Sequence, residues 1–126
     1  SERAWQLEGT GQWTKGKSYR GFAPLGPWLV TPDEVGDVGN LSIWLEVNGH
    51  RYQDGSTRNL VFNVPQIVSY VSNFYQLEAG DLIITGTPAG VGLGQKPPVF
   101  LKPGDSVRAG IDKLGIQQQE IRAWKD

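Results

Sequence analysis

Glycine and proline occur so often in this chain that few segments are long enough to form regular structure. The 126 residues include 17 glycines and 8 prolines, and residues 1–27 alone contain five of the glycines. Both residue types favour turns and fixed bends over the interiors of helices and strands. We therefore expect one domain of short elements joined by long connections, with residues 1–27 irregular.

The strongest prediction of regular structure concerns residues 41–53. Residues 41–47 alternate apolar and polar side chains for most of their length, and Asn48-Gly49 separates them from residues 50–53. An Asn-Gly pair between two such runs is the best short indicator of a two-residue β-hairpin turn. The pattern predicts a β-hairpin.

Residues 63–75 carry the only long helical pattern in the chain. Asn63 is suited to cap a helix, and Pro65 falls in the first turn, where its missing N–H has no cost. The apolar residues recur with helical spacing and predict one buried face: Val64, Ile67, Val68, Val71, Phe74 and Tyr75.

The other expected elements are short. Residues 28–30 and 82–84 are typical of short strands, and residues 31–34 of a helical turn capped by Thr31. The pattern Leu-charged-small-Gly-Asp occurs at residues 77–81 and 101–105, where Gly-Asp favours a turn before a β-prone run. Residues 106–111 and 116–124 are expected to pair across a loop at 113–115. The fold class is therefore α+β and predominantly β, with one main helix.

Composition argues against several classes of function. The chain has no cysteine, which excludes disulfides, thiol catalysis and cysteine-ligated metals within it. A net charge of −1, with basic residues spread along the chain, argues against a nucleic-acid or anionic-membrane surface. There is no long apolar run or signal-type N-terminus, so we expect a cytoplasmic protein. The single histidine, His50, lies beside the hairpin turn and is expected to be exposed.

Residues 85–92 are the best candidate for a ligand-binding loop. Four of these eight residues are glycine or proline, so the segment cannot build a core and leaves backbone N–H groups free. Together with the Thr87 hydroxyl, these groups are suited to an anionic or carbonyl oxygen. No Gly-Lys-Ser/Thr ends the segment, so it is not a P-loop. A plain connecting loop is the alternative.

Two further candidates lie near the N-terminus. Lys17 lies between glycine-rich stretches, and a lysine in a desolvated pocket can orient a carboxylate or stabilise an enolate. The alternative is an exposed loop lysine. Arg3 and Gln6 are three residues apart, so a helical turn would place them on one side, where they suit a carboxylate or 1,3-dicarbonyl ligand. The alternative here is a solvated terminus. No acidic pair has the spacing of metal ligands from one element.

Taken in order, several segments resemble the fumarylacetoacetate hydrolase family. The matching segments are residues 1–6, 16–19, 22–27, 47–49, 53–57, 80–92 and 101–105. The resemblance extends over essentially the whole chain. It implies part of a mixed β-roll, in proteins that are typically cytosolic homodimers with a divalent metal, usually Mg²⁺ and sometimes Mn²⁺ or Ca²⁺.

The resemblance also implies roles for particular residues. It implies Lys17 and Arg3 as catalytic, and Gln6, Tyr19, Gly86, Thr87 and Pro88 as substrate-binding. It places no metal ligand in this chain, because the family's Glu-x-Glu pair and aspartate would fall before Ser1. The family's usual Lys-Ser-Phe-Asp-Thr is replaced here by a segment with Arg20-Gly21 at its end, which changes any contact made by that Asp and Thr.

The function implied by the resemblance is that of a metal-dependent hydrolase, lyase or isomerase of 2-oxo or β-diketo acids, acting through an enolate. Residues 1–126 are then expected to be the C-terminal portion of a catalytic domain, without the N-terminal part that holds the metal. The lack of any methionine agrees with that expectation. The expected partners are a small acid substrate and either a second copy or the missing N-terminal half. A non-catalytic ligand-binding or dimerisation module of the same fold is the alternative.

Overall fold

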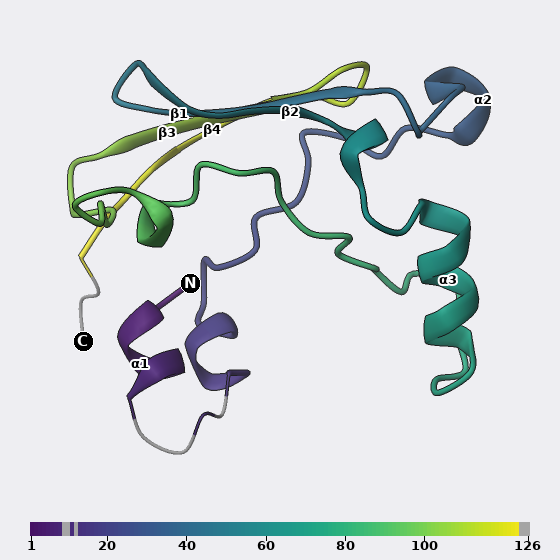
Figure 1. Cartoon of the computed structure of the whole chain (residues 1–126), viewed down its shortest axis with the longest axis horizontal. Helices are drawn as coiled ribbons and strands as arrows, with labels where there is room; N and C mark the ends of the chain where they lie inside the picture. Colours follow the sequence, from purple (N-terminus) through teal and green to yellow (C-terminus); the bar gives the residue numbers. More distant parts are fainter. Residues whose placement is uncertain (9–10, 12, 124–126) are drawn as a thin grey trace.

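The protein is built on one four-stranded antiparallel sheet. The computed structural model describes residues 1–8, 11 and 13–123. The strands are β1 (Ser42–Val47), β2 (His50–Ser56), β3 (Ser106–Ile111) and β4 (Gly115–Glu120), and their order in the sheet is β2-β1-β3-β4. The helix α1, the helix α3 and the long connections lie on one side of this sheet (Figure 1). The structure is a small α+β domain, and the predicted fold class is confirmed.

Both predicted strand pairs form. Asn48 and Gly49 have φ angles of 51° and 82°, the two positive values that a two-residue type I′ turn needs. The central strand β1 pairs with both β2 and β3, so that Leu45 lies opposite Gln53 on one side and Ala109 on the other. The strand β4 ends at Glu120, so the prediction was wrong for residues 121–123, which are not strand; residue 124, where the predicted strand ended, is outside the described part of the chain.

The repeated Leu-charged-small-Gly-Asp pattern forms the same turn twice. In each copy the aspartate carboxylate accepts a 2.9 Å hydrogen bond from the backbone N–H three residues earlier, Asp81 from Glu78 and Asp105 from Lys102. Only the second turn leads into a strand, β3. The predicted strand at residues 82–84 does not form, because an extended segment becomes a strand only when a neighbour pairs with its backbone. The predicted strand at residues 28–30 fails for the same reason.

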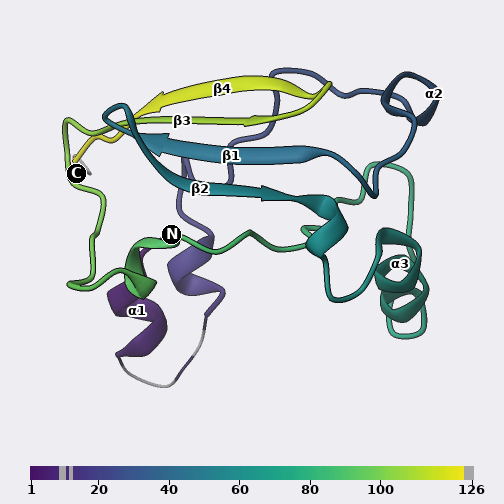
Figure 2. The same ribbon diagram turned by 45° about the horizontal axis from the view of Figure 1, so that its top comes forward.

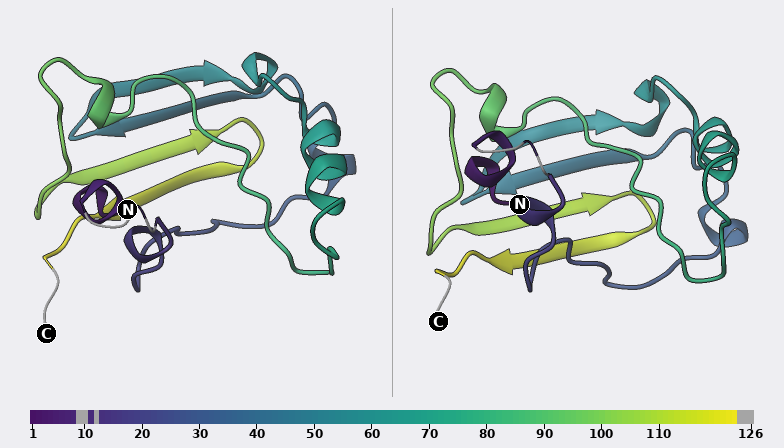
Figure 3. Two further views of the ribbon diagram at one scale, coloured as in Figure 1. Left: turned by 60° about the horizontal axis from the view of Figure 1, so that its bottom comes forward. Right: turned by 90° about the horizontal axis from the view of Figure 1, so that it is seen from below.

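The N-terminal region is more regular than predicted. Residues 3–7 form the helix α1 (Arg3–Leu7), where the Glu2 carboxylate accepts a hydrogen bond from the Ala4 N–H at 3.0 Å. A 3-10 turn, η1 (Lys15–Lys17), packs against it. Figure 3 shows α1, η1 and the chain after α3 lying across one face of the sheet. A capping carboxylate satisfies a free N–H at a helix start, and this overcomes the glycine-rich context.

The helix α3 (Val64–Ser72) has the predicted start but not the predicted buried face. Asn63 and Gln66 form a reciprocal capping box, each side chain bonding the other residue's backbone N–H at 2.9 Å. No residue of α3 is buried, however, and Phe74 and Tyr75 are 65% and 68% exposed beyond its end. The helix lies beyond the end of the sheet (Figure 2). Its apolar side chains are therefore only partly covered by the described residues: Val64, Ile67 and Val71 are half-buried, and Val68 is exposed. The predicted turn at residues 31–34 is confirmed as α2 (Pro32–Val35).

The two faces of the sheet differ in character. The side chains of Ile43 and Leu45 line a hollow on the face that the connections cross, while Trp44 points to the opposite face because successive residues of a strand alternate. There the Arg51 guanidinium lies 4.3 Å from the centre of the Trp44 ring. Glu46 pairs with Arg51 at 2.7 Å. Polar groups thus cover the outer face, and the apolar face is the one that positions the candidate site.

Among the described residues, no helix combines the length and the apolar character that crossing a lipid bilayer would need.

Candidate functional site

The loop at residues 85–92 is fixed against the edge strand β2. The side chain of Gln53, which is only 7% exposed, donates from Nε2 to the Thr87 hydroxyl at 2.8 Å and to the Pro88 carbonyl at 2.6 Å. At Gly90, where φ is 108°, an added Cβ would lie 1.8 Å from the carbonyl oxygen of Tyr52. The backbone of the loop therefore packs directly on β2, and only glycine fits at this position.

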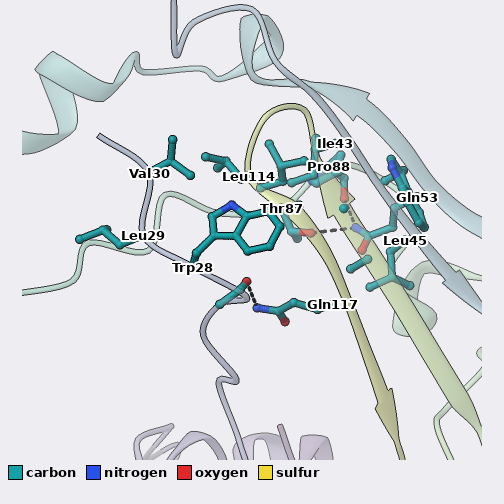
Figure 4. A pocket seen from close by; sticks show the side chains of 16 residues that line it. Trp28, Leu29, Val30, Ile43, Leu45, Gln53, Thr87, Pro88, Leu114 and Gln117 are labelled. Carbon is teal, nitrogen blue, oxygen red and sulfur yellow. Dashed lines mark hydrogen bonds between the residues drawn. The ribbon is translucent and has the colours of Figure 1, made fainter. Parts of the chain in front are cut away.

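A hollow of about 410 Å³ opens beside this loop. Its wall is mainly apolar, with Trp28, Ile43 and Leu45 among the side chains that line it (Figure 4). Thr87 and Pro88 contribute to the wall, as do the amides of Gln53 and Gln117. Gln117 donates to the carbonyl of Gly26. A mostly apolar hollow with a few fixed polar groups is the usual form of a small-molecule site.

A second group of candidate residues gathers where α1 meets η1. Gly16 lies so close to α1 that an added Cβ would be 2.6 Å from the carbonyl of Glu2 and 2.8 Å from Cγ of Gln6. Gln6 is 1% exposed, and its Nε2 reaches the Gly16 carbonyl only at 3.5 Å. Its Oε1 is buried without a hydrogen-bond partner in the described structure. A buried, unpaired acceptor is costly, so this atom is suited to a donor from outside the described residues.

Two cations share one aromatic ring in this second group. The Arg3 guanidinium lies 5.6 Å and the Lys17 ammonium 5.9 Å from the centre of the Trp13 ring, both within range of a cation–π attraction. Positive charge is therefore concentrated here, as an anionic ligand would require.

The structure brings some predicted site residues together and separates others. Arg3, Gln6 and Lys17 lie in one group, and Tyr19 joins it through an edge-to-face contact with Trp5 at 5.1 Å. Thr87 and Pro88 contact β2 instead, and Gly86, with φ of 113°, has open space beside it. Lys17 is exposed, so the described residues alone do not form the desolvated pocket considered for it. His50 is exposed, as predicted, and its ring contacts Tyr52 at 4.6 Å.

Sequence reasoning gave Gln53 no role, although it is the polar group that holds the loop. Its only distinguishing feature in the sequence is a long amide placed where the alternation of β2 turns a side chain inward. Its two acceptors lie 34 and 35 residues further along the chain. A contact over such a separation is not visible in local sequence patterns.

A divalent metal does not fit the residues described. Within residues 1–8, 11 and 13–123, no three side chains of the His, Cys, Asp or Glu type lie together in a way that could hold an ion. Divalent cations such as Mg²⁺ require several oxygen ligands at one point. The described residues therefore supply no metal centre.

Fold and site define a small α+β domain with a backbone-rich loop beside an apolar hollow. The family model for the fumarylacetoacetate (FAA) hydrolase C-terminal region matches residues 1–122. The chain belongs to the fumarylacetoacetate hydrolase family.

The relatives indicate which activities this family includes. A Burkholderia ambifaria protein named "Putative hydrolase" is 60% identical over 123 residues, which cover 97% of this chain and 44% of that protein. The chain thus spans less than half the length of the curated relatives that it matches. The fumarylacetoacetate hydrolase of Exiguobacterium antarcticum is 43% identical, with a TM-score of 0.92 over 97% of this chain and 43% of that one.

A third similar protein was solved with ligands. It is the maleylpyruvate hydrolase from Sphingobium sp. SYK-6 in complex with manganese(II) ion and pyruvate, 38% identical, with a TM-score of 0.74 over 83% of this chain and 37% of that one. Solved structures similar to this chain include both hydrolases and isomerases. Members of the family are therefore enzymes.

Proposed function

We propose that residues 1–126 form the C-terminal portion of a longer catalytic domain, which hydrolyses, cleaves or isomerises 2-oxo or β-diketo acids. The observation that carries the proposal is the pairing of Arg3 and Lys17 over one ring, next to the buried and unpaired Oε1 of Gln6. Two cations close to one ring suit the carboxylate of such an acid. The maleylpyruvate hydrolase bound to pyruvate supports this substrate class.

The proposed roles follow from the chemistry of these side chains. Lys17 and Arg3 act as catalytic groups, because fixed positive charge stabilises an enolate without reorganisation during the reaction. Gln6 and Tyr19 contribute to one wall of the substrate site, and the loop Gly86-Thr87-Pro88 to the other. Thr87 is exposed and lies at the hollow, so its hydroxyl is accessible to a substrate oxygen.

We propose that any divalent cation of this protein, Mg²⁺ or Mn²⁺ or Ca²⁺, is bound by side chains outside residues 1–126. The described residues bring no three ligand side chains together, whereas a similar protein carries manganese. Removing divalent ions from the intact protein with a chelator should abolish turnover, and adding Mn²⁺ back should restore it. Full turnover in the chelator would contradict this proposal.

The expected partner is a second copy or the N-terminal part of the same domain. Leu82 and Ile84 are 63% and 79% exposed in a segment with strand character that has no strand beside it, and exposed apolar segments of this kind favour association. The same surface favours the alternative of a non-catalytic dimerisation module. A cytoplasmic location remains part of the proposal. Light scattering that shows a monodisperse monomer of residues 1–126 would contradict association.

The test of the catalytic proposal compares two lysines of η1 in the intact protein. Lys17→Ala should lower kcat for acylpyruvate or oxaloacetate with Mg²⁺ or Mn²⁺ by about 100-fold, the usual loss when one charge-stabilising group is removed. Lys15→Ala is the matched control, because Lys15 lies 5.1 Å from the Trp5 ring in the same turn and has no proposed role. Equal activity of both variants would refute the assignment of Lys17. No turnover by the wild-type protein would favour the non-catalytic module.

A further inference from the structure

We infer that Gln53 is a positioning residue that makes Thr87 a hydrogen-bond donor toward an anionic or carbonyl oxygen of the ligand. The inference rests on the proposed function, because it concerns the same loop. Gln53 comes from β2 and is 7% exposed. Among the described residues, Gln53 is the only one whose side chain forms a hydrogen bond with the Thr87 hydroxyl. Figure 4 shows this hydrogen bond beside the hollow.

The chemistry of Pro88 determines how the Gln53 amide is oriented. The Pro88 carbonyl can only accept a hydrogen bond, and the amide atom that faces it lies 2.6 Å away. An amide oxygen at that distance would place two acceptors against each other, so the atom must be the nitrogen. The nitrogen carries two protons. One is donated to the Pro88 carbonyl and the other to the Thr87 hydroxyl oxygen at 2.8 Å.

This orientation sets the polarity of Thr87. Its hydroxyl oxygen accepts from Gln53, so its own proton is directed away from β2, where it can be donated. Thr87 is exposed, and the proton is therefore accessible to a ligand. The oxygen keeps one further lone pair, but the free proton can make a charge-assisted hydrogen bond to an anionic oxygen, which makes this hydroxyl best suited to a carboxylate, enolate or carbonyl oxygen. The ligand group at Thr87 should accordingly be an oxygen without a proton.

Close packing keeps this geometry rigid. Besides the contact of Gly90 with Tyr52, an added Cβ at Gly55 of β2 would lie 2.8 Å from Cβ of Pro88. The loop thus lies directly against β2 at Pro88 and at Gly90, both just after Thr87. This packing holds the loop backbone against β2. The hydrogen bond from Gln53 then determines the direction of the Thr87 proton, in addition to any contribution that Gln53 makes to folding.

The test measures pyruvate affinity of the intact protein with Mn²⁺ by calorimetry. Gln53→Glu places a carboxylate that can only accept, so Thr87 should turn its proton toward residue 53 and present a lone pair to the ligand. We expect pyruvate affinity to fall about 10- to 100-fold, the range for a lost hydrogen bond to a charged group. Gln118→Glu, an exposed glutamine on β4, is the control for added charge and should bind as the wild type does.

A double-mutant cycle separates positioning from structural support. Thr87→Val removes the hydroxyl, and in that background Gln53→Glu should cost less than in the wild type, because the part of its effect that acts through the Thr87 proton is already lost and only the part from the Pro88 contact remains. Additive losses would overturn the inference, as would wild-type affinity in Gln53→Glu. If Gln53→Glu does not fold, Gln53→Met replaces it in the same cycle and is read by the same criterion. A wild-type protein that binds no pyruvate would overturn the proposed function and this inference together, whereas the other two outcomes overturn the inference alone.

Discussion

Replacing Gly90 by alanine tests whether β2 holds the loop that carries Thr87. At this position φ is 108°, and an added Cβ would lie 1.8 Å from the Tyr52 carbonyl oxygen. That oxygen belongs to the backbone of a strand, so it cannot move aside as a flexible side chain could. The loop itself must shift away from β2, and both hydrogen bonds of Gln53 to Thr87 and Pro88 would be lost.

The expected cost can be built from two contributions. A non-glycine residue in this backbone region costs about 1–3 kcal/mol, and the two lost hydrogen bonds cost about 1 kcal/mol each. Gly90→Ala should therefore lower the free energy of unfolding by about 3–5 kcal/mol. Gly86→Ala is a matched control, because Gly86 has a φ of 113° but nothing within 4 Å of an added Cβ. It should show the conformational cost alone, about 1–3 kcal/mol.

Urea unfolding of the intact protein measures both costs from the shift in midpoint. Gly90→Ala should be less stable than Gly86→Ala by about 2 kcal/mol, the contribution of the two hydrogen bonds. It should also bind pyruvate more weakly, because Thr87 moves with the loop. Equal stability of the two variants would refute the reasoning, since the contact with Tyr52 would then have no energetic consequence.

Three further predictions concern stability. Asn63→Ala removes the capping box of α3 and should cost about 1 kcal/mol in urea unfolding; an unchanged midpoint would show that the cap is unimportant. Arg51→Ala breaks an exposed ion pair with Glu46 and should change stability by about 1 kcal/mol at most, so a larger loss would contradict the surface assignment. Asn48→Ala removes the side-chain hydrogen bond that contributes most to the lowered pKa of Asp105; the hydrogen bond from the Lys102 backbone N–H, the second contribution, remains. The wild type should exceed Asn48→Ala in free energy of unfolding by its largest amount above pH 3.8, and this difference should shrink as the pH falls below that value. A difference that does not depend on pH would refute the prediction.

The sign of the last prediction follows from linkage. The folded-state pKa of Asp105 lies below its ordinary value of 3.8, so the folded state favours the ionised carboxylate. The stability gained is complete above the ordinary pKa and is lost as the pH falls through the folded pKa. In Asn48→Ala the folded pKa returns toward 3.8, so less stability remains to be lost in acid.

The elements that could be predicted correctly depend on neighbours in the sequence. The Asn48-Gly49 turn, the cap at Asn63 and the two Gly-Asp turns all form as predicted. Each of these rests on a backbone preference or a hydrogen bond between residues at most three positions apart, so the local sequence contains the necessary information. The family resemblance also rests on short ordered segments and is confirmed over residues 1–122.

The predictions that failed depend on partners. Residues 28–30 and 82–84 have strand-like sequences but form no strand, because a strand requires hydrogen bonds from a neighbour that sequence alone does not supply. The apolar side of α3 is not fully buried for a similar reason, since burial depends on what packs against a helix.

By itself, the sequence determined the turns, the helix start and the family of this protein, because these depend on local backbone chemistry and on ordered motifs. Only the tertiary structure brought Arg3 and Lys17 to the same Trp13 ring and placed the Gln53 amide within hydrogen-bonding distance of both Thr87 and Pro88. Such contacts join residues on separate elements, and their distances are set by how the sheet and loops pack. The polarity of the candidate ligand site is therefore a product of the fold.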